Sequence, residues 1–256
     1  TGTIDYGIIL TIVFILIIVY IGMYYHRQSK YSPYLLLDIH STSPNHPKTI
    51  VYGNKIPDSN NNERYTYSLW IYISSDALKN PDSKSEKHYK IILARNKDSI
   101  YKMVYAVDID KKKLLIRYKY SDVNDNLLSD NSQCLKCDID NIPYDRFIHI
   151  AVVKYDYTLV VYNNGILVKS KTFVKNLQTL NKSDTIVNHY YYHDSISQHY
   201  YAVPGWYSKI RYFVDFNKGT GGALSDEQVH DLYLNSPYPS LLEKLINSIF
   251  GKIISF

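Results

Sequence analysis

Apolar and polar residues alternate along much of this chain with a period of two, which is typical of β-strands that pack against a core. The clearest example is residues 64–74, RYTYSLWIYIS. One face of this segment carries Tyr65, Tyr67, Leu69, Ile71 and Ile73, and the other carries Thr66, Ser68, Trp70 and Tyr72. Because both faces carry large side chains, we predict a strand that lies inside a sandwich and is covered on both sides.

Short turn sequences join further strand-like runs into hairpins. These runs are residues 89–94, 101–109, 113–120, 147–155, 158–162 and 166–170. A hairpin-sized gap at 110–112 separates the second and third runs, and Asp156 and Tyr157 turn the fourth into the fifth. Asn164 and Gly165 tolerate the positive φ of a two-residue type I′ turn. Regularly spaced strands with short turns predict an all-β sandwich or barrel.

Near the start of the chain, residues 7–25, GIILTIVFILIIVYIGMYY, contain no charge. At about 1.5 Å per helical residue, such a run can cross roughly 30 Å of hydrocarbon. Asp5 precedes it instead of the basic cluster of a signal peptide, so we predict an uncleaved transmembrane helix rather than a signal peptide or a buried core helix. The predicted span includes Gly7, Ile12, Phe14, Tyr20 and Tyr25.

Charges on either side of this run predict an orientation. Arg27 and Lys30 follow the run, whereas Asp5 is the only charge before it. By the positive-inside rule, we expect a single-pass membrane protein with its large C-terminal domain on the cytoplasmic side.

Helical patterns occur only near the end of the rest of the chain. In residues 224–237, LSDEQVHDLYLNSP, Ser225 and Gln228 form a capping box and Pro237 is a stop signal. Residues 239–256 are predicted to form an amphipathic helix that packs on its own domain, lies on a membrane or inserts into a partner. Its apolar contact stripe includes Leu241, Leu242, Leu245, Ile246, Ile249, Phe250 and Ile253.

The net charge of +5 is spread along the chain. The one dense basic run, residues 111–113, is explained by a solvated hairpin turn, so nucleic acid is not an expected partner.

Cys134 and Cys137 are the only cysteines. Zinc needs about four ligands, and a redox pair normally opens a helix, whereas CLKC precedes DIDNIP, which is typical of a loop entering a strand. Inert thiols or a local disulfide are therefore expected.

The acidic residues do not form the pattern of a glycoside hydrolase, which needs two carboxylates flanking one bond. The four glutamates are far apart in sequence: Glu63, Glu86, Glu227 and Glu243. The aspartates at 108 and 110, and those at 138 and 140, sit at strand ends, where Asp bonds its own backbone in turns. No G-x-S-x-G elbow occurs, and His149 lies in an apolar strand as a core or edge histidine would. We therefore expect no catalytic residue, metal or cofactor.

Residues 188–206, NHYYYHDSISQHYYAVPGW, are unusual in composition. Three histidines at 189, 193 and 199 could meet a metal, and the tyrosines could stack on sugar rings. The chain contains 28 tyrosines in all, so an ordinary loop is the competing interpretation. The candidate ligand or partner surface comprises Tyr190, Tyr191, Tyr192, Tyr200 and Tyr201.

Five segments together resemble a known kind of domain. They are KIPDSNNNERYTYSLWIYIS, KHYKIILAR, NIPYDRFIHIAVVKYDYTLVVYNNGILVKS, GWYSKIRYF and GALSDEQVHDLYLNSP. Their order and spacing resemble laminin-G-like, concanavalin A-like jelly-roll domains, and most of all the membrane-anchored variety encoded by giant nucleocytoplasmic DNA viruses. The resemblance covers residues 33–238 and implies two antiparallel sheets of about six or seven strands each. Phe147 stands where that family often has Trp. This fold hosts lectins, hydrolases and interaction modules, so it implies no activity.

The expected fold is an all-β, two-sheet antiparallel jelly-roll sandwich with a helix at each end. Its expected parts are a stub at 1–6, a transmembrane helix at 7–25, a tether at 26–32, the sandwich at 33–238 and an amphipathic helix at 239–256. We expect a non-enzymatic, membrane-anchored binding or structural protein. The resemblance implies a virion component that bridges an internal membrane and the capsid, with a lipid bilayer and capsid or other virion proteins as partners. A glycan-binding lectin and an inactive glycoside hydrolase are the alternatives.

Overall fold

The computed structural model divides the chain into two units, Thr1–Pro33 and Tyr34–Phe256. In the first unit it describes positions 7, 11, 14–16, 18–20 and 22. In the second it describes residues 34–42, 49–52, 64–75, 89–97, 100–123, 127–180, 184–190, 205–214 and 222–235.

All described residues of the first unit are helical. The Thr11 hydroxyl donates to the Gly7 carbonyl one turn earlier, at 2.8 Å. Phe14 is 62% exposed, and its described apolar neighbours are exposed as well. Within the described residues, no helix has both the length and the apolar character needed to cross a membrane. Much of the predicted span, including Ile12 and Tyr25, and all of the tether lie outside the described residues, so the transmembrane helix stays a prediction.

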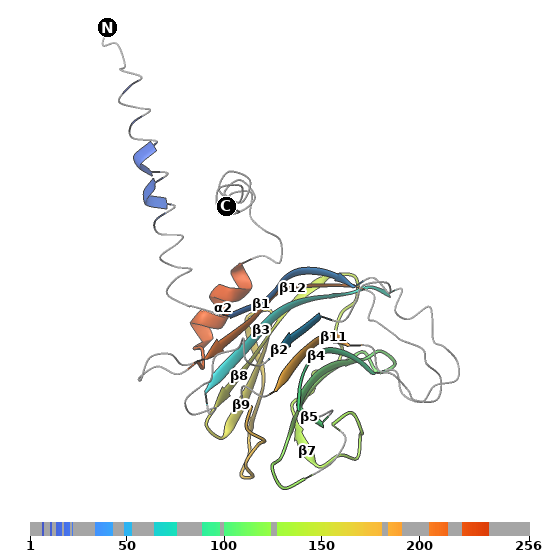
Figure 1. The fold of residues 1–256 in the computed structure, drawn as a ribbon. Helices are drawn as coiled ribbons and strands as arrows, with labels where there is room; N and C mark the ends of the chain where they lie inside the picture. The colour runs from blue at the N-terminus through green and yellow to red at the C-terminus, as the bar shows by residue number, and fades with distance from the viewer. Residues whose placement is uncertain are drawn as a thin grey trace. The chain divides into compact units, whose positions relative to one another are not determined.

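The described part of the second unit contains two six-stranded antiparallel sheets (Figure 1). Sheet A has the order β1 (Tyr34–Thr42), β12 (Gly205–Val214), β3 (Tyr65–Ile73), β8 (Phe147–Tyr155), β9 (Thr158–Asn163) and β10 (Ile166–Thr172). Sheet B has the order β2 (Thr49–Tyr52), β11 (Thr185–Tyr190), β4 (Tyr89–Lys97), β5 (Ile100–Asp108), β6 (Lys113–Lys119) and β7 (Cys134–Lys136). The predicted antiparallel β-sandwich with about six strands in each sheet is confirmed.

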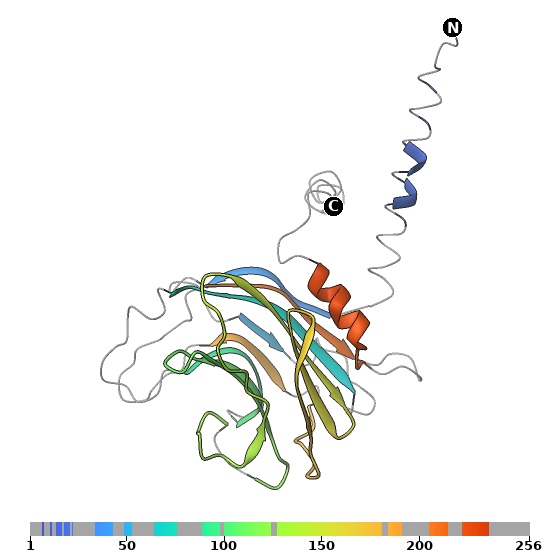
Figure 2. The ribbon, with the colours of Figure 1, turned by 180° about the vertical axis from the view of Figure 1, so that it is seen from behind.

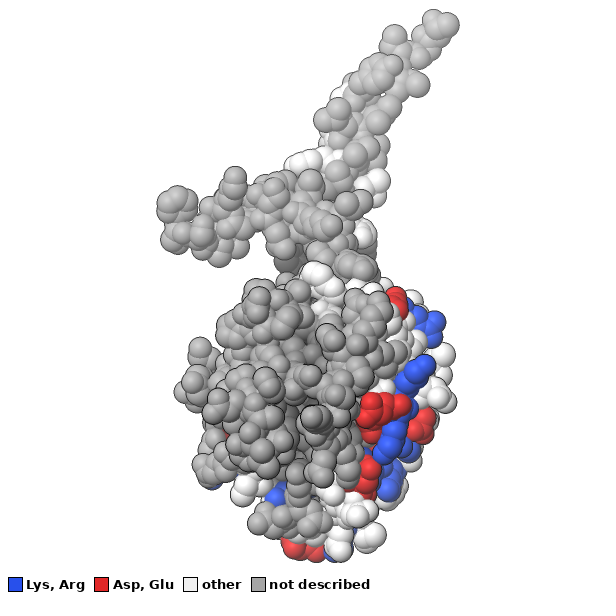
Figure 3. Space-filling model, turned by 90° about the vertical axis from the view of Figure 1, so that its right-hand side faces the viewer, with Lys and Arg blue, Asp and Glu red and all other residues white. Residues whose placement is uncertain are grey.

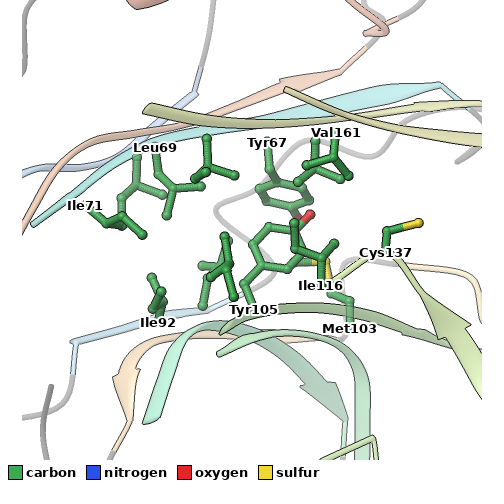
Figure 4. Packing of buried hydrophobic residues seen from close by; sticks show 14 of the residues in the cluster. Tyr67, Leu69, Ile71, Ile92, Met103, Tyr105, Ile116, Cys137 and Val161 are labelled. Atoms are coloured by element: carbon green, nitrogen blue, oxygen red, sulfur yellow. The ribbon is translucent and has the colours of Figure 1, made fainter. Parts of the chain in front are cut away.

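The main core lies between the two sheets. Tyr67, Leu69 and Ile71 of β3 point from sheet A toward residues of sheet B such as Met103 and Tyr105 (Figure 4). All five side chains are almost completely buried. Burying a side chain of this size stabilises a fold by roughly 1.5–3 kcal/mol. The alternation in residues 64–74 therefore forms one wall of the core, as predicted.

Helix α2 (Asp226–Leu234) covers the opposite face of sheet A, which is visible from behind in Figure 2. Trp70 of β3 stacks on Tyr233 of α2 with ring centroids 5.8 Å apart. The Thr66 hydroxyl donates to the Gly222 carbonyl and accepts from the Leu224 amide. Strand β3 is therefore covered on both faces, as predicted, with a helix as its second cover.

The predicted start of this helix is also confirmed. Ser225 is the N-cap, and its hydroxyl accepts from the Gln228 amide. The Gln228 side chain in turn accepts from the Ser225 amide at 2.8 Å. This reciprocal pair satisfies two amides at the start of the helix that have no partner within it.

A second, smaller core lies on the outer face of sheet B. Leu127 and Leu128 pack there against residues such as Val104 and Leu115. The Arg117 guanidinium donates to the Leu127 carbonyl at 2.9 Å, and its other terminal nitrogen lies 3.3 Å from an Asp138 oxygen. This buried arginine therefore fixes the segment after β6 onto the sheet.

The predicted hairpins agree closely with the observed strands. Strand β8 has the predicted bounds, and β9 and β10 extend the predicted runs by one and two residues. Asn164 and Gly165 have φ angles of 52° and 74°, as a type I′ turn requires. The loop predicted at DIDNIP, residues 138–143, is confirmed, since this segment lies outside the named strands and leads into β8. The strand just before it was not predicted: Cys134–Lys136 forms β7, which pairs with β6 and lies at the end of sheet B.

Candidate functional site: the open edge of sheet A

A buried serine–histidine pair is the arrangement that most resembles a catalytic group. Ser68 Oγ and His149 Nε2 are 2.9 Å apart on adjacent strands β3 and β8. Both residues are buried, and Trp70 and Tyr233 pack against the imidazole. Nδ1 of His149, where a catalytic triad places a carboxylate, has no hydrogen-bond partner among the described residues. The pair is therefore structural, as the apolar strand around His149 predicted.

Burial also determines the charge of this histidine. Burial, with a smaller contribution from the charge of Arg211, lowers the pKa of His149 from 6.5 to about 3. The imidazole is consequently neutral at physiological pH and stays so while helix α2 covers it. A neutral, inaccessible histidine cannot exchange protons with a substrate, since a general base must reach the proton it abstracts.

The paired aspartates also have structural roles. Asp108 accepts from the Lys111 amide at 3.1 Å in the turn after β5, as predicted. Asp138 accepts from the Ile116 amide and pairs with Arg117, which the sequence did not indicate. Asp140 pairs with Lys113. No group of three or more potential metal ligands occurs within the residues that the structure describes.

Cys134 and Cys137 are both buried and free. Cys134 belongs to the outer core of sheet B, whereas Cys137 belongs to the core between the sheets. Burial raises the pKa of Cys137 to about 11 and raises that of Cys134. Of the two predicted alternatives, the structure supports inert thiols over a local disulfide.

Sequence reasoning missed a buried ionic cluster at one side of the core. Arg95 and Asp184 are 3.3 Å apart and almost fully buried, and the Lys102 ammonium lies 2.6 Å from the same carboxylate. Arg95 also donates to the Tyr67 hydroxyl. The local sequence at Arg95 is an ordinary strand end, so nothing in it distinguishes a buried arginine from an exposed one. The Asp184 carboxylate pairs with both cations and offsets part of their charge within the fold, which is a structural role.

Strand β10 is exposed to solvent, whereas the serine, histidine, cysteine and ionic groups described above are buried. Each of its seven residues is exposed, and Ile166, Leu167 and Val168 are 66%, 50% and 44% exposed. It is the last strand of sheet A and pairs with β9 on one side. No other hydrogen bond to its backbone occurs among the described residues. We call this strand and its outward backbone the β10 edge.

The pairing with β9 determines which way the side chains of the β10 edge face. Lys169 and Lys171 lie opposite Val161 and Leu159, whose side chains point into the core. Both lysines therefore extend from the core-facing side of sheet A, beyond its last buried strand. Leu167 lies opposite Tyr162 on the other side. A shift in register between Leu167 and Lys169 marks a bulge, so regular pairing is possible over residues 169–172.

Both ends of the hairpin that carries the β10 edge are fixed. At one end, Arg64 binds both carboxylate oxygens of Asp156 at 2.9 Å, in the turn between β8 and β9. At the other end, the turn at Gly165 lies against His230 and Tyr233 of α2. The Tyr162 hydroxyl donates to Asp226 at the start of the same helix. The edge is thus presented by a firmly anchored hairpin (Figure 2).

Charge on the visible surface is mixed. On the face in Figure 3, the described Lys and Arg side chains are interspersed with Asp and Glu side chains. Among the described residues, Lys175 pairs with Asp122 and Lys111 pairs with Asp130. The described part of this face therefore shows no continuous basic stripe of the kind that binds a nucleic-acid backbone.

The residues predicted as a ligand surface are not tested by this geometry. Tyr190 is the last residue of β11. Tyr191, Tyr192, Tyr200 and Tyr201 lie outside the described residues, as do the histidines at 193 and 199 and the whole predicted contact stripe from Leu241 to Ile253. These assignments stay predictions.

Comparisons with known proteins support the fold. No protein-family model matches the chain, and no curated protein matches its sequence. The chain is similar to the crystal structure of the botulinum neurotoxin serotype D binding domain, with a TM-score of 0.54 and 15% identity over 77% of this chain and 42% of that chain. It is also similar to the receptor binding domain of the botulinum neurotoxin C/D mosaic serotype, with a TM-score of 0.52 and 16% identity over 74% of this chain and 40% of that chain. The chain matches less than half the length of these neighbours, and such low identity shows a shared β-sandwich fold alone.

Proposed function

We propose that this chain is a non-enzymatic binding domain held at a membrane by its N-terminal segment. The observation that carries the proposal is the contrast between the buried reactive groups and the β10 edge. Ser68, His149 and the two cysteines are all inaccessible, whereas β10 is exposed along its whole length. The structural neighbours include receptor binding domains, which supports a binding role for this fold.

The membrane attachment rests on the uncharged run at residues 7–25. The exposed apolar side chains of Phe14 and Leu16 support it, because water is a costly environment for them and hydrocarbon is not. Attachment at one end would leave the sandwich projecting from a bilayer. The charges at Arg27 and Lys30 favour the cytoplasmic side.

The partner that we favour is a protein shell. The sequence resemblance to membrane-anchored proteins of giant viruses suggests a virion component that bridges an internal membrane and the capsid. The second candidate is a membrane-anchored lectin, which the tyrosine-rich segment from Tyr190 to Tyr201 supports through its stacking surfaces. Co-purification of the full chain with detergent-resistant capsid fractions supports the bridge. Binding of the detergent-solubilised full chain to a glycan array, without capsid recovery, would support the lectin.

Membrane attachment is tested on the full chain with Ile12→Asp and Leu16→Asp. A charge at the centre of a span costs about 2.5–3.5 kcal/mol in insertion, so the double variant should be extracted by carbonate. The matched control is Gln28→Asp with Ser29→Asp, which adds the same charge outside the span and should stay in the membrane. Equal retention of both variants would contradict the anchor.

A second attachment through the tail has its own test. The eight large apolar side chains of the predicted stripe, at 241, 242, 245, 246, 249, 250, 253 and 254, would stabilise binding by roughly 1.5 kcal/mol or more each if buried. Leu245→Glu with Ile249→Glu should leave the sandwich folded and weaken lipid or particle association. A lower melting temperature with unchanged association would show instead that the tail covers its own domain.

A further inference from the structure

The sequence around the β10 edge is strongly biased in charge. Residues 157–183 contain no Asp or Glu and four lysines, at 169, 171, 175 and 182. Lys175 is paired with Asp122. Lys169 donates to the Asp138 carbonyl at 2.9 Å and Lys171 has no hydrogen bond or ion pair among the described residues, so neither meets a carboxylate. The edge is therefore locally basic although the chain as a whole is only moderately so.

These two lysines lie at alternate positions and on the same side of the strand. A strand added beside β10 would place its own alternate side chains directly opposite them, about 4.5–5.5 Å away. The same added strand would face Ser170 and Thr172 on its other side, since these residues have the opposite orientation. Cross-strand pairing thus favours acidic residues at every second position, with hydroxyl or apolar residues between them.

We propose that the β10 edge binds an extended acidic polypeptide segment by strand addition, as a further strand of sheet A. Backbone hydrogen bonds to the outward side of residues 169–172 provide the affinity, and carboxylates facing Lys169 and Lys171 select the partner. The inference deepens the proposed binding function and rests on it, because it names the chemical class of the partner. It does not depend on membrane attachment.

Charge also decides against a second copy of this chain as the occupant. In a two-fold pairing of β10 with itself about Lys169, that lysine would face its own copy, and like charges directly opposite are destabilising. The lysines and the bulge are features that natural edges use against such self-association. An acidic strand turns the same lysines into attractive partners.

The test uses the full chain in detergent and measures peptide binding by fluorescence anisotropy. The probe is a labelled, end-blocked peptide in which Glu and Thr alternate, and its counterpart has Lys in place of Glu. The acidic peptide should bind and the basic one should not. In the protein, Lys169→Glu with Lys171→Glu should weaken binding of the acidic peptide about tenfold or more, from the loss of two cross-strand pairs and their replacement by repulsion. This variant should bind the basic peptide instead.

Two controls separate strand addition from general attraction. Lys97→Glu with Lys111→Glu makes the same change in net charge on sheet B and should change the affinity by less than about twofold, because distant exposed charges are screened. An acidic peptide methylated on alternate backbone nitrogens keeps its charge and loses its edge hydrogen bonds, so it should not bind.

Three results would overturn the inference. The first is equal binding of the methylated and unmethylated acidic peptides, and the second is an equal loss of affinity in both lysine pairs. The third is dimerisation of the full chain that is strengthened by Lys169→Ala, because relief of like-charge repulsion at a two-fold β10 pairing would identify a second copy as the occupant. Carbonate extraction and capsid recovery remain separate readouts, so failure here is distinguishable from failure of the proposed membrane-bound function.

Discussion

Strands β3 and β10 belong to the same sheet and both contain runs of large apolar residues, yet their environments are opposite. Strand β3 lies between β12 and β8, with sheet B on one face and α2 on the other. Strand β10 is the last strand, with both faces exposed. An apolar side chain on β3 therefore contributes to stability, whereas one on β10 is available to a partner. Position in the sheet, rather than residue type, separates the scaffold from the candidate binding surface.

The largest expected effect compares one substitution on the two strands. Ile71 is fully buried on β3 and Ile166 is 66% exposed on β10. Ile71→Ala should lower the free energy of unfolding by about 2–5 kcal/mol, because it removes buried methyl groups and leaves a cavity. Ile166→Ala should change it by less than about 0.5 kcal/mol. Urea unfolding measures both, and similar losses would mean that β10 is covered after all.

The next effect concerns His149 of β8, which lies beside β3 on the face of sheet A that α2 covers, and it depends on pH. Because the folded-state pKa of His149 is about 3 and its ordinary value is 6.5, protonation favours the unfolded chain as the pH falls below 6.5. The stability due to neutral His149 is fully present above pH 6.5 and is lost progressively toward pH 3. At about 1.4 kcal/mol per pH unit, the loss should reach about 2 kcal/mol at pH 5.

The control for this effect is His149→Gln, whose amide can still bond Ser68 and does not titrate in this range. Unfolding measured from pH 8 to pH 5 should show a shallower loss of stability for the variant than for the natural chain. Parallel pH profiles would indicate that other groups cause the acid sensitivity and that His149 is not held neutral.

A moderate effect is expected where the β10 hairpin meets α2. Gly165 has a φ of 74°, and a Cβ there would lie 2.9 Å from His230 Nδ1 and 3.1 Å from Tyr233 Cβ. Gly165→Val should lower the free energy of unfolding by more than about 1 kcal/mol through backbone strain and collision. Gly165→Asn tolerates the positive φ and should cost less. An unchanged melting temperature in Gly165→Val would refute the turn.

The smallest effect is expected at β7, the last strand of sheet B in its described part. Cys134 in β7 and Cys137 directly after it face different cores and form no disulfide. A reducing agent should therefore leave the melting temperature unchanged. A thiol reagent at pH 8 should label neither cysteine in the folded protein and both after denaturation. Rapid labelling of the folded protein would show that this end of sheet B is as open as the β10 edge.

Several features of the fold could be predicted from neighbouring residues. The alternation in 64–74, the pair Asn164 and Gly165, and the capping box at Ser225 each specify local backbone geometry through side chains a few residues apart. That is why β3, the β9–β10 turn and the start of α2 agree with expectation. Strand β7 was not predicted, because a strand of three residues has too few alternations to show a period.

The candidate site could not be predicted in the same way. The segment ILVKS, residues 166–170, can form either an interior strand or an edge strand of a sheet. Its residues alone do not reveal whether another strand lies beside it. Its only local signal is the absence of acidic residues around Lys169 and Lys171, which gains meaning once the edge is known. The sequence directed attention to Tyr190–Tyr201 and to the tail instead, because unusual composition is visible without a fold.

By itself, then, the sequence determined strands β3 to β6 and β8 to β10, the turns at 110–112, 156–157 and 164–165, the helix cap, the uncharged run at 7–25 and the lack of a catalytic motif. The tertiary structure alone decided that β10 is exposed, that Arg95 is buried against Asp184 and that Cys134 and Cys137 face different cores. The physical reason is the range of the interactions. Dihedral preferences and hydrophobic periods act between near neighbours in the sequence, whereas burial depends on pairings such as β1 with β12, which join residues far apart in the sequence.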